Sequence, residues 1–254
     1  MTDLTADETR AAVRDHYAKV STGRTCCAPG CCATTPQSTL IGYSADELAA
    51  LPDGADMGLG CGNPQAIAAL RPGETVLDLG SGGGFDSFLA ARVVGPTGHV
   101  IGVDMTAEMI ALSRANARKV SATNVEFRLG EIEHLPVADR SVDIILSNCV
   151  INLSPDKPAV FAEAFRVLRP GGRLAISDVV AIAPIPAELR NQVAALSGCI
   201  AGATPIDDVR KHLADAGFTS IAVDIAPRSA EIVESWMAGA SALIASATIE
   251  ARRP

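Results

Sequence analysis

The sequence predicts an α/β fold in which parallel strands alternate with helices. From Thr75 onward, short aliphatic runs alternate with segments of helical spacing. A glycine-rich loop joins the first of these runs to the first helical segment. Aromatic residues make up 4% of the chain and hydrophobic residues 48%, a mix that is typical of aliphatic strands covered by helices and not of a β-sandwich.

The region before Thr75 contains short helices and loops. Residues 5–20 are expected to form a helix, because Thr5 is a suitable N-cap and apolar side chains recur near one face. The Ser21–Pro36 segment is rich in Cys, Gly, Thr and Pro and is expected to be a loop. One or two helical turns are expected over Ser44–Leu51, followed by a loop over Pro52–Pro64.

Seven strands are expected in the rest of the chain: Thr75–Leu79, His99–Val103, Val125–Leu129, Val142–Leu146, Arg173–Val180, Ser220–Ile225 and Ile244–Ala251. Helices are expected over Phe85–Val94, Ala107–Val120 with Thr106 as N-cap, and Pro158–Leu168, and helical and loop segments over residues 184–217. This alternation predicts a Rossmann-like, mostly parallel sheet with helices on both faces. It divides the chain into an N-terminal, Cys-rich part (1–64), a nucleotide-binding core (65–180) and a part with an insertion after the fifth strand and the last two strands (181–254).

Charge and composition exclude several classes of partner. The net charge is −8 and there is no long run of Lys and Arg, so we expect no nucleic acid as partner. No run of 18 apolar residues is present, which predicts no membrane span. The acidic N-terminus resembles neither a signal peptide nor a transit sequence, so the expected location is the cytoplasm.

The glycine loop predicts a cofactor site. Its sequence runs from Asp78 to Gly84 and lacks the third glycine of the dinucleotide fingerprint, where Phe85 stands. It fits D-x-G-x-G-x-G instead and resembles the first motif of class I S-adenosylmethionine methyltransferases. Asp104, at the end of the second strand, is placed to accept ribose hydroxyls, and the resemblance implies that Ile132 and Glu133 contact adenine. The expected cofactor-binding residues are Asp78, Gly80, Ser81, Gly82, Asp104, Met105, Ile132, Glu133 and Asn148.

Three of the seven cysteines stand apart, and each lies where a loop can reach the ligand crevice. Cys149 follows the fourth strand, and the carboxyl ends of strands in an open α/β sheet face that crevice. Cys61 lies in a glycine-rich loop upstream, and Cys199 lies in the insertion after the fifth strand. Three converging thiols predict a soft substrate such as trivalent arsenic, As(III), which binds three sulfurs as a pyramid.

Four strings make this resemblance specific: GLGCGNP, VLDLGSGGGFD, SNCVINLSPDKP and SGCIAGA. They are similar to those of the arsenite S-adenosylmethionine methyltransferases, in family order, from about residue 10 to the end. The resemblance implies methylation of arsenite or its thiol conjugates for arsenic detoxification, with Cys149 and Cys199 as As(III) ligands and Cys61 beside them.

The resemblance also implies a redox cycle. Cys61 would pair with a cysteine of the N-terminal cluster, Cys32 or Cys31 by spacing, to reduce arsenic after each methylation. Thioredoxin or a small thiol such as glutathione would then reduce the disulfide. The doubled cluster of Cys26, Cys27, Cys31 and Cys32 is more than the family pattern needs, and which of the four pairs with Cys61 stays open.

Other interpretations remain open at this point. The N-terminal cluster is also compatible with structural zinc, and Cys149 with a small core side chain. The chain could methylate a carbon or a small thiol, although neither chemistry needs three separately placed cysteines. It could also be a thiol-rich arsenic binder without turnover, an alternative that the intact cofactor loop argues against.

Overall fold

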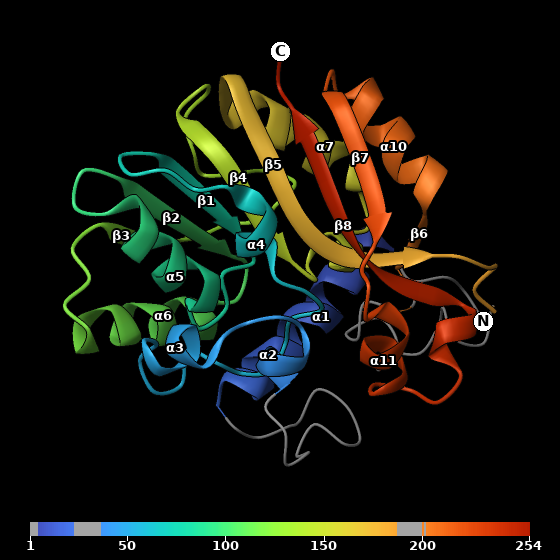
Figure 1. The fold of residues 1–254 in the computed structure, drawn as a ribbon, viewed down its shortest axis with the longest axis horizontal. Helices are drawn as coiled ribbons and strands as arrows, with labels where there is room; N and C mark the ends of the chain where they lie inside the picture. Colours follow the sequence, from blue (N-terminus) through green and yellow to red (C-terminus); the bar gives the residue numbers. More distant parts are fainter. Residues whose placement is uncertain (1–4, 23–36, 187–199, 201) are drawn as a thin grey trace.

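The computed structural model describes residues 5–22, 37–186, 200 and 202–254 (Figure 1). The N-terminal helix α1 (Ala6–Ser21) begins with a reciprocal cap. Thr5 Oγ1 accepts a hydrogen bond from the Glu8 amide, and the Glu8 carboxylate accepts one from the Thr5 amide. The helix expected over residues 5–20 is thereby confirmed.

Three short helices follow: α2 (Gln37–Leu40), α3 (Ala45–Ala49) and α4 (Pro64–Ala68). The expected turns near Ser44 are confirmed as α3, whereas α4 was not expected from the sequence. Its start has a local cause, because Pro64 suits the first helical position and Asn63 Oδ1 accepts a hydrogen bond from the Ala66 amide at 3.2 Å.

Seven strands form one continuous sheet in the order β3-β2-β1-β4-β5-β8-β7 (Figure 1). Their bounds are β1 Thr75–Leu79, β2 His99–Asp104, β3 Val125–Leu129, β4 Val142–Asn148, β5 Leu168–Ala181, β7 Thr219–Ile225 and β8 Ile244–Arg252. β1 to β5 are parallel, and β8 runs antiparallel to both β5 and β7. A two-residue strand, β6 (Thr204–Pro205), pairs with the end of β5. The expected mostly parallel sheet is confirmed.

Helices cover both faces of this sheet because its strands alternate their apolar side chains. Leu77 and Leu79 face one core cluster with α7 (Lys157–Val167) and α10 (Ile206–Asp215). Val76 faces the other cluster with α4 and α5 (Phe85–Val94). The remaining elements are α6 (Ala107–Lys119), α11 (Ser229–Glu234) and the 3-10 turns η1 (Ile151–Leu153) and η2 (Ala240–Ala242).

The start of β5 differs from the expectation. The fifth strand was expected over Arg173–Val180, but β5 follows α7 directly and begins at Leu168, which pairs with Val142 of β4. Between Leu168 and Arg173 the register with β4 shifts, as in a β-bulge. There Gly171 N donates to Arg253 O at 2.8 Å and Arg253 N donates to Gly172 O at 2.9 Å. These pairings with residues distant in sequence extend the strand.

Thr106 stands at the N-cap position of α6, but its side chain makes no capping hydrogen bond. The division into residues 1–64, 65–180 and 181–254 stays a prediction, although α4 crosses its first boundary and β5 its second.

Within the described part of the chain, no helix has the length and apolarity needed to span a membrane.

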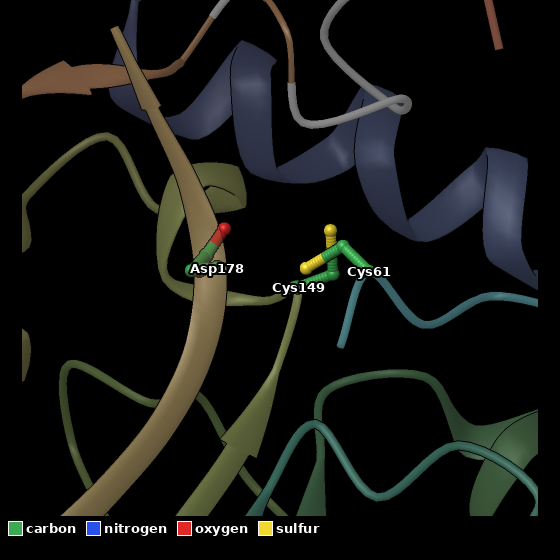
Figure 2. A group of neighbouring side chains, drawn as sticks. All are labelled: Cys61, Cys149 and Asp178. Carbon is green, nitrogen blue, oxygen red and sulfur yellow. The ribbon is translucent and has the colours of Figure 1, made fainter. Parts of the chain in front are cut away.

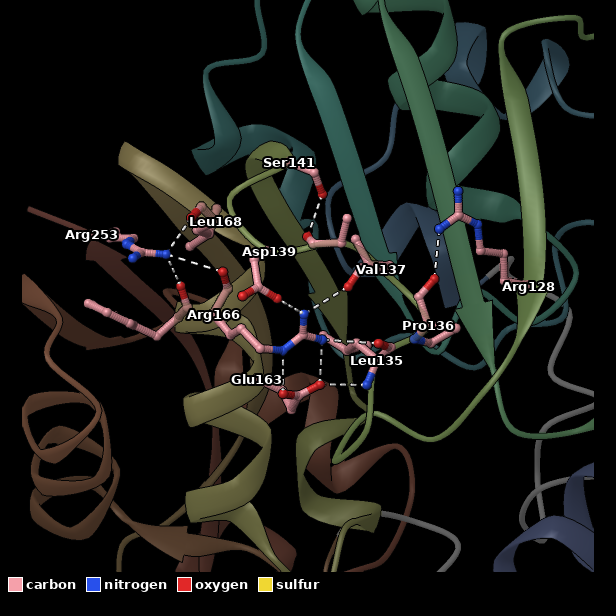
Figure 3. A network of polar contacts seen from close by, with 12 residues as sticks. Arg128, Leu135, Pro136, Val137, Asp139, Ser141, Glu163, Arg166, Leu168 and Arg253 are labelled. Atoms are coloured by element: carbon pink, nitrogen blue, oxygen red, sulfur yellow. Dashed lines mark hydrogen bonds and ion pairs between the residues drawn. The ribbon is translucent and has the colours of Figure 1, made fainter.

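Arg166, in α7, binds the segment that follows β3 through hydrogen bonds (Figure 3). Its guanidinium donates hydrogen bonds to the carbonyls of Leu135 and Val137, at 3.0 and 2.9 Å. It also pairs with Glu163 at 2.6 Å, and Glu163 accepts the Leu135 amide at 2.7 Å. One arginine therefore holds the backbone that runs on from Ile132 and Glu133.

We predict that Arg166→Ala lowers the free energy of unfolding by about 1–3 kcal/mol, because two backbone carbonyls and the carboxylates of Glu163 and Asp139 each lose a hydrogen-bond donor. Urea unfolding measures this. The control is Arg169→Ala, since the Arg169 side chain is 48% exposed in its pair with Asp143. Such exposed pairs contribute about 0–1 kcal/mol. Equal losses in the two variants would contradict the account.

Candidate active site

The glycine loop between β1 and α5 is shaped by close contacts. Gly80, Gly82 and Gly84 all have positive φ angles, of 66°, 50° and 94°. A Cβ at Gly80 would lie 2.4 Å from a methyl group of Val150, so only glycine fits beside that residue. The loop is tied to the end of β2, because Gly82 N donates to Asp104 Oδ2 at 3.0 Å. Backbone amides and a carboxylate therefore border the same space.

Two neighbouring pockets meet at this loop, with empty volumes of about 720 and 530 Å³ including their open mouths. All nine residues expected to bind the cofactor line one pocket or both. The larger pocket takes Asp104, Met105, Ile132 and Glu133, the smaller takes Asp78 and Ser81, and Gly80, Gly82 and Asn148 border both. Residues from four strand ends thus converge on one cavity system.

The carboxylates of this site are buried. Burial, followed by the neighbouring charges of Asp86 and Asp104, raises the pKa of Asp78 well above its usual value. Burial likewise raises the pKa of Asp86, against the hydrogen bond from Tyr43, and the pKa of Asp104. Because carboxylates that lose water need compensation, the site favours a ligand that carries positive charge and hydrogen-bond donors.

Helix α1 closes the larger pocket from the opposite side. Arg10 and Tyr17 line it together with Glu133. Arg10 Nε lies 3.2 Å from Glu133 Oε1, which also accepts the Ser154 hydroxyl at 2.7 Å. Glu133 was expected to contact adenine, but its Oε1 atom already accepts hydrogen bonds from Arg10 and Ser154.

Beside the larger pocket, where Cys149 lines it, two cysteines and an aspartate come together (Figure 2). The sulfurs of Cys61 and Cys149 and a carboxylate oxygen of Asp178 all lie within 4.8 Å of one another. All three residues are buried, and Cys149 lines the pocket. The structure therefore brings together two of the predicted arsenic-site thiols. Cys199, Cys32 and the rest of the N-terminal cluster lie outside the described residues.

The side-chain amide of Asn148, at the end of β4, holds the Cys61 loop in this position by hydrogen bonds. Asn148 Oδ1 accepts the Cys61 amide at 3.0 Å, and Asn148 Nδ2 donates to Gly62 O at 2.9 Å. A Cβ at Gly60 would lie 2.9 Å from Asn148 Nδ2, and one at Gly62 would lie 2.8 Å from Ser177. The glycines on either side of Cys61 thus allow its loop to lie directly on the ends of β4 and β5.

Cys149 has a left-handed backbone, with φ of 60°, which is uncommon for a residue with a side chain. Its amide donates to Ser177 O at 2.8 Å. Asp178 holds the turn that follows: its carboxylate accepts the Ile151 amide at 2.8 Å and Asn152 Nδ2 at 2.9 Å. Burial raises the pKa of Asp178 to about 6, against these hydrogen bonds.

An apolar cluster surrounds the two thiols. Besides Cys61 and Cys149 it includes Val179, Ile185 and Ile200. The chain that follows Cys199 in sequence therefore returns to this site, since Ile200 is buried there. A Cβ at Gly202 would lie 2.0 Å from the Asn152 carbonyl oxygen, so Gly202 also permits a close approach.

Sequence reasoning missed several residues of this site, among them Arg10, Tyr43, Asp86 and Asp178. Tyr43 donates a 2.6 Å hydrogen bond to Asp86, and Asn148 contacts both. Asp178 carried a usable signal, because it stands near the carboxyl end of the fifth strand. Nothing in the sequence around Arg10 or Tyr43 indicates a place in the site, since their contacts join segments far apart in sequence.

Known proteins resemble this chain over most of its length. A family model described as a methyltransferase domain matches residues 70–217. An arsenite methyltransferase of Halobacterium salinarum is 54% identical over 99% of this chain and 68% of its own length. An arsenite methyltransferase of Mus musculus is 34% identical over 78% of this chain and 54% of its own length. The chain thus spans about half the length of the mouse relative.

A solved structure agrees with these relatives. The crystal structure of an arsenic(III) S-adenosylmethionine methyltransferase from Chlamydomonas reinhardtii superposes with a TM-score of 0.63 at 33% identity. The match covers 89% of this chain and 73% of that one. By fold, family model and sequence identity, the chain belongs to the arsenite S-adenosylmethionine methyltransferase family.

Proposed function

We propose that this protein transfers a methyl group from S-adenosylmethionine to trivalent arsenic held by cysteine thiolates, as its relatives' names suggest. The single observation that carries the proposal is the pair of buried, neighbouring thiols Cys61 and Cys149, of which Cys149 lines the larger pocket beside residues expected to bind the cofactor. Thiolates select soft centres, and As(III) is one.

The polar groups of the two pockets fit S-adenosylmethionine. Asp104 keeps lone pairs beyond the bonds from Gly82 N and Thr106 N, so it can accept ribose hydroxyls in the larger pocket. Ser81 Oγ is buried and has no hydrogen-bond partner among the described residues, so a polar ligand atom can use it. Asp78 and Asp86 line the smaller pocket, where they suit the amino group and the nearby positive sulfur of the methionine portion.

When bound, S-adenosylmethionine supplies a methyl group on a positively charged sulfur. Cys149, Cys199 and Cys61 are proposed to ligate As(III) so that its lone pair points at that methyl group. No proton needs to leave the arsenic, so the protein acts mainly by alignment, which can lower a barrier by roughly 7–11 kcal/mol. The left-handed backbone of Cys149 supports this role, since strained conformations gather where a side chain must be aimed.

Methyl transfer oxidises arsenic formally by two electrons, so a cycle needs a two-electron reductant. We propose that Cys61 and a cysteine of the N-terminal cluster, Cys32 or Cys31 by spacing, supply both electrons and become a disulfide. Thioredoxin or a small thiol such as glutathione would then reduce this disulfide by thiol exchange. Cys61 suits the task because it lies beside Cys149.

The site favours methylation of arsenic over the two other functions considered, which are methylation of a carbon or small thiol and arsenic binding without turnover. A carbon or small-thiol acceptor gives no reason for two buried thiols beside the methyl-donor pocket. A binder without turnover gives no reason for nine cofactor-lining residues around two joined pockets. No observation favours either, so neither is proposed.

Replacing the thiols tests the acceptor site. We predict that Cys149→Ser and Cys199→Ser each abolish arsenite methylation, because As(III) loses a sulfur ligand, while S-adenosylmethionine still binds. Chromatography of arsenic species and calorimetric titration of the cofactor measure the two effects. Normal arsenite turnover in either variant would remove that cysteine from the ligand set.

Replacing Asp104 tests the cofactor site. We predict that Asp104→Asn weakens S-adenosylmethionine binding by roughly ten- to a hundredfold, since a charged acceptor contributes about 1.5–3 kcal/mol per hydrogen bond. Glu108→Gln is the matched control, because Glu108 is exposed on the adjoining helix α6 and should leave affinity unchanged. Equal affinities for both variants would contradict a role of Asp104 in binding.

A further inference from the structure

We propose that Arg10, on helix α1, positions the Glu133 carboxylate so that the cofactor site selects adenine over bases that lack its amino group. Arg10 and Glu133 both line the larger pocket, although they lie 123 residues apart in the chain. The inference deepens the proposed function and rests on its cofactor half, because it requires adenine to lie against Glu133.

The two carboxylate oxygens of Glu133 have different surroundings. Oε1 accepts hydrogen bonds from Arg10 Nε at 3.2 Å and from the Ser154 hydroxyl at 2.7 Å. Ser154 is held in turn, since its oxygen accepts the Asp156 amide at 3.0 Å. Within the part of the chain that the structure describes, no donor bonds Oε2. One oxygen of the carboxylate is therefore used by the protein, and the other is left for a ligand in the pocket.

Burial makes this division important. The Glu133 side chain is 5% exposed and that of Arg10 is 16% exposed. A carboxylate that has lost its water needs hydrogen bonds or an opposite charge, and the Arg10 guanidinium supplies both. Because Oε1 is bonded from two sides, rotation of the carboxylate would break both bonds at once. Glu133 is thus fixed before the cofactor binds, which limits the entropy lost on binding.

The turn that carries Glu133 suits adenine. His134 N donates to Glu131 O at 3.1 Å, which closes the turn after β3, and Arg166 holds the backbone that follows (Figure 3). Ile132 lies between the two glutamates, is buried and lines the same pocket. Adenine has apolar ring faces and an amino group that donates hydrogen bonds. An apolar side chain beside a fixed acceptor matches both properties.

A second arginine of α1 provides a comparison. Arg14, one turn after Arg10, lies 3.9 Å from Glu131. The Arg14 side chain is 46% exposed and that of Glu131 is 34% exposed, and such pairs contribute little to stability. Neither residue lines the larger pocket. A substitution of Arg14 therefore removes the same charge from the same helix and leaves the contacts of Glu133 in place.

Calorimetric titration of the full chain with two product analogues tests the role of Arg10 without arsenic. S-adenosylhomocysteine carries the amino group of adenine, whereas S-inosylhomocysteine carries a carbonyl oxygen there, which a carboxylate repels. We expect the protein to bind the adenine compound roughly ten- to a hundredfold more tightly, the range that one hydrogen bond to a charged acceptor supports. Glu133→Gln should remove this preference, because a glutamine amide can also donate to the carbonyl oxygen.

Arg10→Met is the decisive variant. It keeps an apolar stem but removes the donor and the charge, so Glu133 can turn away, and we expect the preference for adenine to fall by at least about fivefold. Arg10→Lys restores a charged donor and should recover part of the preference. Arg14→Met is the matched control and should keep the preference within about twofold of the original protein. An equal loss of preference in Arg14→Met would overturn the role of Arg10.

The ratio of the two affinities separates positioning from general stability. A purely structural effect of Arg10→Met would weaken both compounds alike, and an unchanged ratio would therefore refute the inference. Equal binding of both compounds by the original protein would refute it too, since adenine would then not use Glu133. Binding of neither compound would contradict the cofactor site and with it the proposed function. Loss of the Arg10 role alone would leave arsenite methylation standing.

Discussion

The side-chain amide of Asn148 joins the Cys61 loop to the end of β4, and the arrangement of the site depends on it. It bonds Cys61 N and Gly62 O, from a segment 87 residues earlier in the chain, and it borders both cofactor pockets. Together with Ser246, whose hydroxyl donates to the Cys61 carbonyl at 2.7 Å, this contact holds Cys61 beside Cys149. Because glycines flank Cys61, the loop can approach close enough for the amide to reach it.

Buried carboxylates and thiols give the site its chemical preference. Asp78 and Asp86 are buried side by side near the glycine loop, and Asp178 is buried beside the two thiols. Such groups are stabilised by ligands that bring positive charge or hydrogen-bond donors. S-adenosylmethionine carries a positive sulfur, which the buried carboxylates suit. The acceptor that we propose, As(III), is a soft centre, which the two thiols suit.

Local signals in the sequence predicted much of the fold. The Thr5–Glu8 cap, the alternating aliphatic strands and the glycine loop each act over a few residues, and the relatives confirm the family that the motifs suggested. The early start of β5 was missed because it depends on Leu168 pairing with Val142 and on Gly171 pairing with Arg253. Asp178 was missed because its neighbours resemble a plain core strand, and Arg10 because its partner Glu133 is 123 residues away.

The central claim is that the cofactor pocket and the thiols serve one reaction. The most direct test follows conversion of S-adenosylmethionine to S-adenosylhomocysteine with and without arsenite, under excess reduced thiol. The account predicts conversion that depends on arsenite and yields methylated arsenic. Cofactor binding with no conversion on adding arsenite, or equal conversion without it, would contradict the claim.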